Sequence, residues 1–344
     1  PCLWNRSKVH ELDKHNDKPG AEGQRPINSL ESAGCIYFKH VWRECKPRSV
    51  RHYASGYQKN KSRIHAIMQQ ECLRSRLRQS KISHVTTFRD VKNGFPSPKH
   101  AKCDEAVLAV CHDWHARLLV QRHRQAYMHF DHPDGNADFK VGSGFMQGDG
   151  PAADEFLEVY HPALDKWIQN INTNGKRMSI PAWDLVHSQW VDVSISTYAD
   201  DVGQTACGHE LSSIVQQSNS AFTDALLEIG AVQNLDKQEH LVFCAGRHAY
   251  RDTRRHYDPQ LALLSGKTLI AARYLAPMLH RTGSYDLEIK RRVQAAAIGW
   301  QTMGAFWRRV STGVRQLRII FHGMVHEAML SGMEALVLKK GQLH

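Results

Sequence analysis

The sequence predicts an α+β fold, and three observations support this. Residues 191–197 alternate apolar and polar side chains, which is the period of a half-buried strand. Residues 102–128 instead repeat apolar side chains at helical spacing. From the strand near residue 84 to the strand near residue 244, the chain runs strand, helix, strand, turn, strand, helix, strand. This order indicates a sheet domain with a basic extension at the N-terminus and a helical appendage at the C-terminus.

The individual elements are predicted in chain order. Residues 1–24 are polar and indicate a hairpin or loop, and residues 246–266 are irregular and basic and indicate a linker. Helical periodicity predicts helices over 62–80, 102–128, 148–171, 210–229, 286–309 and 313–335. Extended character predicts strands over 84–88, 127–132, 137–142, 191–197 and 240–244. The turn Asp134-Gly135 joins 127–132 and 137–142 as a hairpin.

Composition narrows the class of partner. The chain has 344 residues, enough for two or three subdomains, and 42% are hydrophobic, which supports a packed core. Lys and Arg total 45 against 34 Asp and Glu, a net charge of +11 that favours a polyanion, most simply nucleic acid. No segment is typical of a membrane span or a signal peptide, so we expect an intracellular location, nuclear or cytoplasmic, and no membrane partner. The chain begins with Pro1, so we expect a fragment of a longer product.

Cysteine and histidine patterns do not indicate a metal-binding module. The eight cysteines are scattered without a C-x-x-C pair, so we expect reduced thiols, some of them buried. His322 and His326 lie four residues apart on an expected helix and could bind a metal. A helix face that carries two histidines is the more ordinary interpretation.

The acidic pair Asp200-Asp201 is the strongest functional signal. It stands in SISTYADDVGQTACG between two extended runs, so we expect it at the tip of a tight hairpin. Adjacent carboxylates repel, and the ordinary use of such a pair is to hold magnesium for phosphoryl or nucleotidyl transfer. Asp90 ends an upstream strand and is the best candidate for the further carboxylate of a two-metal site. Its alternative role is to cap the turn at Asn93.

Seven blocks in order resemble reverse transcriptases, specifically those of non-LTR (LINE-type) retrotransposons, and the resemblance runs from about Lys14 to about Leu338. The blocks are RPINSL (25–30), SGYQKNKSRIHAI (55–67), FRDVKNGFPSPKH (88–100), GSGFMQGDGPAADEF (142–156), STYADD (196–201), IGAVQNLDKQEHLVF (229–243) and RYLAPMLHRTGSYDLEIKRRVQAAAIGW (273–300).

The resemblance implies a right-hand polymerase fold. Its fingers would span 1–84, and its palm, an antiparallel sheet with helices, would span 85–245 with an insertion around 103–150. A palm–thumb connection with a primer-grip-like region would follow at 246–285, and a truncated helical thumb at 286–344. The implied activity is RNA-directed DNA polymerase: a primer 3′-hydroxyl attacks a dNTP on an RNA template, and pyrophosphate leaves.

The resemblance also implies catalytic roles. Asp90 and Asp200 would be the main ligands of two Mg²⁺ ions, with Mn²⁺ as an alternative, and the Val91 carbonyl would assist. Asp201 would lie nearer the primer terminus. Lys237 would protonate or steady the leaving pyrophosphate, although a solvated surface lysine is the competing interpretation.

Further roles concern the nucleotide and the template–primer duplex. Arg25 would contact the triphosphate, with either Lys14 or Lys18 assisting. Phe95 would block a ribose 2′-hydroxyl, unless it is an ordinary core residue. Gln147 and Gly148 would contact the incoming nucleotide and template. Basic side chains would line the nucleic-acid path, or else form solvated helix faces: Arg63, Arg74, Arg76, Arg78, Lys290, Arg291 and Arg292.

The chain departs from the family pattern at three places. Gly94 stands where Ala is usual, residues 149–151 replace Ser-Pro-Leu, and Ala276 replaces the Gly of Y-L-G. Two alternatives therefore remain: a catalytically decayed remnant that still binds nucleic acid, and a group II intron or retron-type enzyme. A viral RNA-dependent RNA polymerase would more often show Gly-Asp-Asp at the hairpin.

Overall fold

The computed structural model describes residues 3–13, 24–45, 51–131, 135–173, 178–309 and 311–336. The chain forms two compact units, each assembled from separate stretches of sequence. Unit 1 comprises Pro1–Arg51, Val91–Arg177 and Ser218–Asn234, and unit 2 comprises His52–Asp90, Met178–Gln217 and Leu235–His344. Both contain helices and sheets, which confirms the α+β class. The boundaries expected for fingers, palm and thumb stay predictions.

A five-stranded sheet is the centre of unit 2. Its strand order is β13 (Lys267–Thr268), β12 (Glu239–Phe243), β3 (His84–Arg89), β10 (Asp201–Cys207) and β9 (Ile195–Tyr198). All six residues of β3 are buried, and this strand pairs antiparallel with both β10 and β12. Its β-branched and aromatic side chains suit a strand that is covered on both faces.

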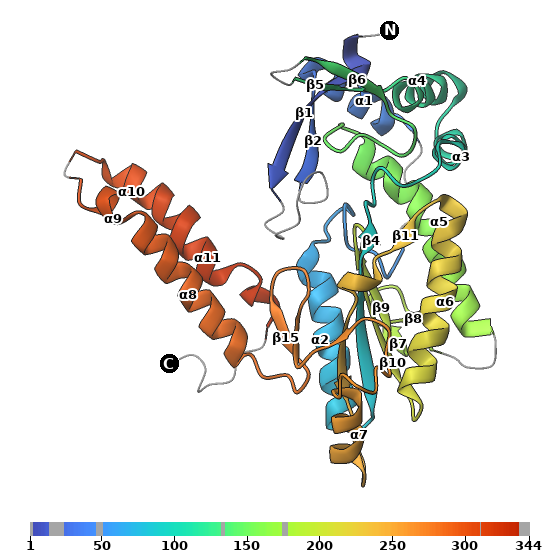
Figure 1. The fold of residues 1–344 in the computed structure, drawn as a ribbon, viewed down its shortest axis with the longest axis vertical. Coiled ribbons are helices and arrows are strands. Elements are labelled where there is room, and N and C mark those ends of the chain that lie inside the picture. The colour runs from blue at the N-terminus through green and yellow to red at the C-terminus, as the bar shows by residue number, and fades with distance from the viewer. Residues whose placement is uncertain are drawn as a thin grey trace. The chain divides into compact units, whose positions relative to one another are not determined.

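Helix α2 (Arg63–Gln79) lies along this sheet (Figure 1). It buries Ala66 and Ile67 against Phe88 and Leu241. A buried glutamine of α2 also bonds to the sheet. The Gln70 side chain accepts a 2.7 Å hydrogen bond from Thr205 Oγ1 and donates to the backbone carbonyls of Ser194 and Gly203. The helix expected over 62–80 is therefore confirmed, but it is a core element despite its basic composition.

The strand expected over 191–197 is wrong in detail. It is two strands, β8 (Gln189–Asp192), which pairs with β7 (Pro181–Asp184), and β9 in the main sheet. The Asp192 carboxylate causes the break, because its Oδ1 accepts hydrogen bonds from the backbone N–H groups of Ser194 and Ile180, each at 2.9 Å. Such a local side-chain bond competes with continued strand pairing.

Unit 1 contains a four-stranded sheet in the order β2 (Gln24–Leu30), β1 (Arg6–Asp13), β5 (Tyr127–Phe130) and β6 (Ala137–Lys140). The β5–β6 hairpin confirms the predicted one. A two-stranded ladder joins β4 (Val91–Lys92) and β11 (Val232–Gln233). Helices α1 (Ser32–Arg43) and α5 (Ala152–Thr173) lie in this unit, and α6 (Leu211–Ile229) begins in unit 2 and ends in unit 1.

The helix expected over 102–128 is two helices and a strand. It breaks into α3 (His100–Val110) and α4 (Asp113–Arg124), and the chain then enters β5. Cys111, the residue after α3, has extended backbone angles, φ −104° and ψ 151°. The linker expected over 246–266 was also wrong in part, because it contains α7 (Ala249–His256).

Two cysteines are joined, contrary to the expectation of eight reduced thiols. Cys45 and Cys111 form a disulfide across a sequence separation of 66 residues. Both are buried in a cluster with Phe38, Trp42 and Leu119. Their pairing results from the packing of α1 against α4, so no local spacing in the sequence signals it.

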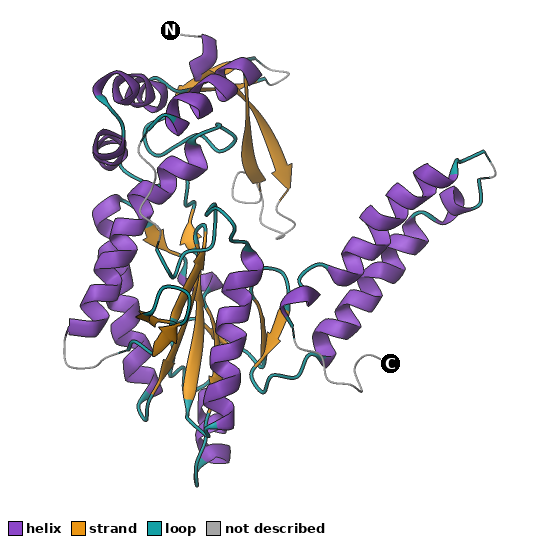
Figure 2. Cartoon of the chain, turned by 180° about the vertical axis from the view of Figure 1, so that it is seen from behind, coloured by secondary structure: helices purple, strands orange, loops and turns teal. Residues whose placement is uncertain are grey.

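The C-terminal part of unit 2 follows a small hairpin, β14 (Ala271–Arg273) and β15 (Met278–His280). Helix α8 (Asp286–Thr302) runs beside α10 (Val314–Phe321) and α11 (Glu327–Leu330), as Figures 1 and 2 show. Short α9 (Gly304–Trp307) follows α8, and a π-helical turn, His322–His326, joins α10 to α11. Among the described residues, none of the helices has the length and apolar character to cross a membrane.

Candidate active site

The acidic pair lies at the tip of a hairpin, as expected. The last paired residues of β9 and β10 are Tyr198 and Asp201, so Ala199 and Asp200 form the two-residue turn. Ala199 has a φ of 56°, in the left-handed region that tight hairpin turns require. Asp200 therefore belongs to the turn itself, and Asp201 begins the strand that leads into the core.

The segment before α2 holds this hairpin from its open edge. Thr197 N–H donates to the Tyr53 carbonyl at 2.8 Å, and Ser55 N–H donates to the Thr197 carbonyl at 2.9 Å. Gly56 lies so close to the turn that a Cβ there would be 2.2 Å from the backbone nitrogen of Ala199. The glycine of the SGYQKNKSRIHAI block is thus required by the turn that presents the carboxylates.

Tyr274 supports the hairpin from the core. Its hydroxyl lies 3.0 Å from Ser196 Oγ, and its ring stacks on Phe88 with centroids 4.6 Å apart. Burial raises the pKa of Tyr274, and a smaller raising effect comes from the Asp201 carboxylate. Tyr274 is thus neutral, and it supports the acidic hairpin through its hydrogen bond to Ser196.

Strand pairing brings Asp90 to the same end of the sheet. Val202 of β10 pairs with Arg89, the last residue of β3, in antiparallel register, so Asp90 follows β3 at the end of the sheet where Asp201 begins β10. Both carboxylates line an open pocket of about 560 Å³ in unit 2. The other lining residues are Phe88, Arg89, Asp236, Lys237, Glu239, Lys267, Arg273, Tyr274, Leu275 and Ala276.

The carboxylates interact strongly. The pKa of Asp201 is raised to about 7, chiefly by burial and then by the charges of Asp200 and Asp90, while Lys237 acts in the opposite direction. A group with this pKa is part protonated at neutral pH, because burial and the two neighbouring carboxylates all disfavour its charged form. The site therefore has a deficit of positive charge.

Lys237 supplies part of that charge. It ends a 3₁₀ turn (Leu235–Lys237), and its Nζ lies 2.9 Å from Asp90 Oδ2. The Lys237 side chain is 67% exposed, so the ion pair is one that solvent and ligands can disrupt. The sequence predicts Lys237 as a site residue but does not show that its partner is Asp90.

The carboxylate donors suit a divalent cation, but the described side chains do not form a complete coordination shell for one. Carboxylate oxygens are the preferred ligands of Mg²⁺, and a cation there would relieve the repulsion that raises the pKa of Asp201. In the part of the chain that the structure describes, no three or more His, Cys, Asp and Glu side chains are grouped to hold a metal ion. Magnesium binding by Asp90 and Asp200 stays a prediction, and Asp201 is the member of the pair that lines the pocket.

The expected nucleotide contacts lie in unit 1. Phe95 stacks on Phe156 with centroids 5.0 Å apart and is only partly buried. The Gln147 carbonyl accepts a 3.2 Å hydrogen bond from Asn28 N–H. Gly148 has a φ of 111°, and a Cβ on this residue would collide with the Asn28 carbonyl oxygen at 2.4 Å. Packing against β2 therefore explains Gly148 without a nucleotide, and the roles of these residues stay predictions.

Val91 and Arg25, two further residues that the sequence predicts for the site, both lie in strands of unit 1. Val91, the first residue of β4, is buried, and it follows Asp90 directly in the chain. Arg25 pairs through its backbone with Leu12, but its side chain lies outside the described residues. Lys14 and Lys18 lie outside them as well.

The predicted nucleic-acid arginines are not equivalent. Arg74 is 1% exposed; it pairs with Glu71, and its Nη2 donates to the His280 carbonyl at 2.7 Å. Arg292 is also buried, with Nε 2.6 Å from Glu288 Oε1. These two arginines hold the protein's own elements together, and their burial does not fit a nucleic-acid contact.

The remaining basic residues differ in exposure. Arg76 and Lys290 are exposed. Arg63, Arg78 and Arg291 are partly buried, and two of them have protein partners: Arg63 Nη2 donates to Ser331 Oγ at 2.7 Å, and Arg291 pairs with Glu288. Arg273 and Lys267 line the pocket that holds Asp90 and Asp201, here called the acidic pocket. The sequence did not predict them as site residues, although Arg273 is the first residue of the 273–300 block.

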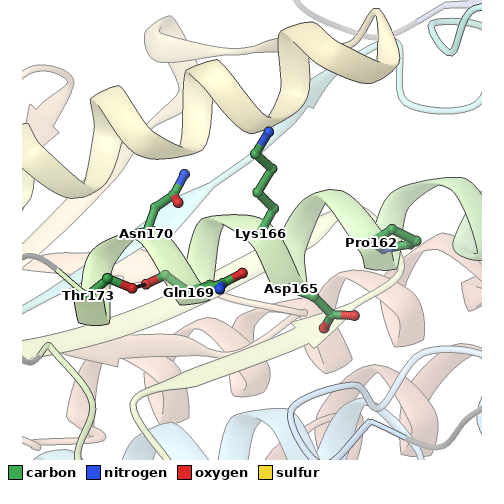
Figure 3. A pocket seen from close by; sticks show the side chains of 6 residues that line it. All are labelled: Pro162, Asp165, Lys166, Gln169, Asn170 and Thr173. Atoms are coloured by element: carbon green, nitrogen blue, oxygen red, sulfur yellow. Dashed lines mark hydrogen bonds between the residues drawn. The ribbon is translucent and has the colours of Figure 1, made fainter.

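A second hollow, of about 570 Å³, lies on α5 in unit 1 (Figure 3). One face of that helix supplies all its lining: Pro162, Asp165, Lys166, Gln169, Asn170 and Thr173. Lys166 forms an ion pair with Glu228 of α6, and Asp165 one with Arg51 at 2.9 Å. Since these charges are already compensated within the protein, we treat the hollow as a surface feature and the acidic pocket as the candidate site.

Comparisons with known proteins agree at the level of the fold. No protein-family profile matches the sequence, and no curated protein matches it. Among solved structures, telomerase from Candida tropicalis in complex with a TWJ fragment of telomeric RNA aligns over 96% of this chain and 54% of its own, with TM-score 0.54 and 8% identity. Apo telomerase from the same organism aligns over 99% and 60%, with TM-score 0.50 and 8% identity.

These alignments cover little more than half of the telomerase chains. At this identity they show the fold alone, without an activity, a substrate or a retrotransposon origin. The chain has mixed helices and sheets in the fold of telomerase, which is a reverse transcriptase.

Proposed function

We propose that this chain is the catalytic domain of an RNA-directed DNA polymerase, which transfers nucleotides from dNTPs to a primer 3′-hydroxyl. The placement of Asp90 directly after β3 carries the proposal, because β3 pairs with β10 and both Asp90 and Asp201 line one open pocket beside the acidic turn. The fold shared with telomerase supports the same class of reaction. The finer assignment to a non-LTR retrotransposon rests on the seven sequence blocks.

The acidic turn and several pocket residues have roles in this chemistry. Asp90 and Asp200 would hold two Mg²⁺ ions, with Mn²⁺ as an alternative, and Asp201 would add negative charge beside them. When bound, such ions lower the pKa of the attacking hydroxyl and neutralise charge on the leaving group. Lys237, released from Asp90, would place its ammonium at the leaving pyrophosphate, and Lys267 and Arg273 would add positive charge for phosphate oxygens.

The partners follow from charge and fold. A net charge of +11 favours nucleic acid, and the telomerase of one matching structure is bound to an RNA fragment. An RNA template paired with a DNA primer is the substrate that fits both observations. Exposed Arg76 and Lys290 are the best-placed of the predicted contact residues.

Primer extension tests the proposal. Purified protein is given a labelled DNA primer on an RNA or a DNA template, with dNTPs or rNTPs and Mg²⁺ or Mn²⁺. We expect dNTP addition on RNA, with at least a hundredfold loss in Asp90→Ala and Asp200→Ala. Asp252→Ala, which removes an exposed carboxylate of α7 in the same unit, is the control and should extend normally. Folded wild-type protein that extends no primer with either metal would refute the activity.

A decayed remnant that only binds nucleic acid is the second candidate. It is favoured by Ala276, whose backbone φ of 116° is a glycine conformation held by an alanine beside the acidic pocket. This candidate predicts salt-sensitive binding of primer–template without synthesis, which the same preparation measures by fluorescence anisotropy. A group II intron or retron-type enzyme would extend primers too, and is distinguished by its helical extensions in the full-length product.

A further inference from the structure

Two histidines in unit 1 each have a buried ring nitrogen without a partner. His100 begins α3, and His123 is near the end of α4. His100 Nε2 and His123 Nδ1 are both shielded from solvent and accept or donate no hydrogen bond. Their ring centroids lie 5.5 Å apart, with the ring planes tilted by 45°. Buried polar atoms are nearly always satisfied, so each of these two nitrogens is expected to have a further partner.

The opposite side of His123 is already oriented. Its Nε2 lies 2.7 Å from Asp104 Oδ1, one turn along α3 from His100, and Arg124 also pairs with that carboxylate. The His123 side chain is 3% exposed, and its ring packs edge-on against Phe145 at 5.5 Å. A carboxylate that accepts the proton of one ring nitrogen leaves a lone pair on the other, which is the usual arrangement behind a metal-bound imidazole.

The spacing of the rings fits a shared ion. With Zn–N distances of about 2.0–2.1 Å and a tetrahedral angle, two imidazoles on one zinc ion have ring centres roughly 5 Å apart. The observed 5.5 Å requires only a small adjustment of two side chains.

We propose that His100 and His123 form a two-imidazole site for Zn²⁺ or a similar transition-metal ion, with Asp104 as the carboxylate that orients His123. No group of three such ligands exists among the described residues, so water completes the shell. Cys103 is buried nearby, but its Sγ is directed at the Pro98 carbonyl, 3.9 Å away. The site ties the start of α3 to the end of α4. It is independent of the acidic pocket and of polymerase activity.

Zinc titration of the full chain tests the site. The protein is stripped with EDTA, dialysed and titrated with Zn²⁺ alone by calorimetry. A His322→Ala/His326→Ala background removes the other close histidine pair, whose ring centroids are 4.9 Å apart. In that background we expect one zinc site that depends on His100 and His123. His100→Asn and His123→Asn should each weaken it more than tenfold, and Asp104→Asn by about tenfold through the lost orientation.

The control is His112→Ala, which removes an exposed imidazole between α3 and α4 and should bind zinc normally. Zinc affinity that is equal in the background protein and its His100→Asn variant would overturn the proposal and assign the two nitrogens to an ordered water. If His123→Asn does not fold, X-ray absorption of the zinc-loaded background protein decides. Two imidazoles in the first shell support the site, and a shell with fewer than two refutes it.

Discussion

The backbone around the acidic hairpin allows almost no room at residue 56. A Cβ on Gly56 would lie 2.2 Å from Ala199 N and 3.0 Å from the Tyr198 carbonyl carbon, both backbone atoms that cannot rotate away. The glycine therefore allows the turn that bears Asp200 to pack directly against the backbone at residue 56. A larger residue would displace the hairpin from Asp90.

Gly56→Ala should lower the free energy of unfolding by roughly 1–3 kcal/mol, as overpacking does, and should reduce primer extension more than the loss of folded protein explains. Urea denaturation and extension at a temperature where the variant is folded check both effects. Gly304→Ala is the matched control, because a Cβ there meets nothing within 4 Å. Equal stability of both variants would show that the turn moves freely.

Ala276 is the second residue under backbone constraint. Its φ of 116° and the φ of 52° at Leu275 belong to the four-residue link Tyr274–Pro277 between β14 and β15. Tyr274 N–H donates to the Pro277 carbonyl at 3.0 Å, and Arg291 Nη2 donates to the Ala276 carbonyl at 2.8 Å, so the turn is held in this form.

Ala276→Gly should raise the free energy of unfolding by about 1 kcal/mol, because glycine adopts this φ without steric cost. Thermal unfolding of the variant should therefore occur at a higher temperature than in the wild type. Ala271→Gly, in the neighbouring strand β14, should have the opposite sign, since its backbone gains nothing from glycine. A lower melting temperature for Ala276→Gly would contradict the strained geometry.

At the scale of elements, one buried carboxylate attaches α8 to the rest of unit 2. Glu288 is fully buried, and its Oε2 accepts from Met278 N–H of β15 at 2.9 Å. Arg291 and Arg292 donate to the same side chain at 2.7 and 2.6 Å, and Arg292 Nη1 continues to the Ala328 carbonyl of α11 at 3.2 Å. One side chain thus joins α8, β15 and, through Arg292, α11.

Glu288→Gln should cost about 3–5 kcal/mol, because it removes the charge that two arginines share and leaves Arg292 buried without compensation. Hydrogen exchange should show early loss of protection in α8 and α11. Asp286→Asn changes an exposed carboxylate of the same helix and should cost little. Unchanged protection of α8 in Glu288→Gln would place the attachment elsewhere.

At the scale of the whole molecule, acid should unfold the protein through buried neutral histidines. His240 has no exposed surface; its Nε2 donates to the Ser265 carbonyl at 2.7 Å, and its Nδ1 lies 3.0 Å from Thr87 Oγ1. The pKa of His240 is lowered to about 4, chiefly by burial; the hydrogen bond to Ser265 opposes this shift, and the charges of Arg89 and His256 add to it.

Because this pKa is depressed in the folded state, the unfolded chain binds the proton first. The contribution of His240 is complete above pH 6.5 and is lost progressively as pH falls toward 4, by about 3 kcal/mol in total. Urea denaturation at several pH values checks this, and His240→Gln should show a smaller slope over that range. An identical slope in the variant would assign the acid sensitivity to other groups.

Local sequence pattern predicted the elements whose structure depends on neighbours in the chain. The β5–β6 hairpin, helix α2 and the β9–β10 turn with its two aspartates all follow from periodicity or turn residues. Periodicity did not predict breaks that depend on one side chain or on packing, as at Asp192 and Cys111. Asp90 was connected to the pair through its place at the end of an upstream strand and through the order of blocks.

The sequence by itself determined the α+β class, the acidic hairpin and the positive charge that favours nucleic acid. Only the tertiary structure decided that Asp90 and Asp201 line one pocket, that Lys237 pairs with Asp90, that Arg74 and Arg292 are interior residues, and that Cys45 joins Cys111. The physical reason is the same in each case. Periodicity records which face of an element is apolar, whereas these contacts depend on strand register and on helices that meet far apart in the chain.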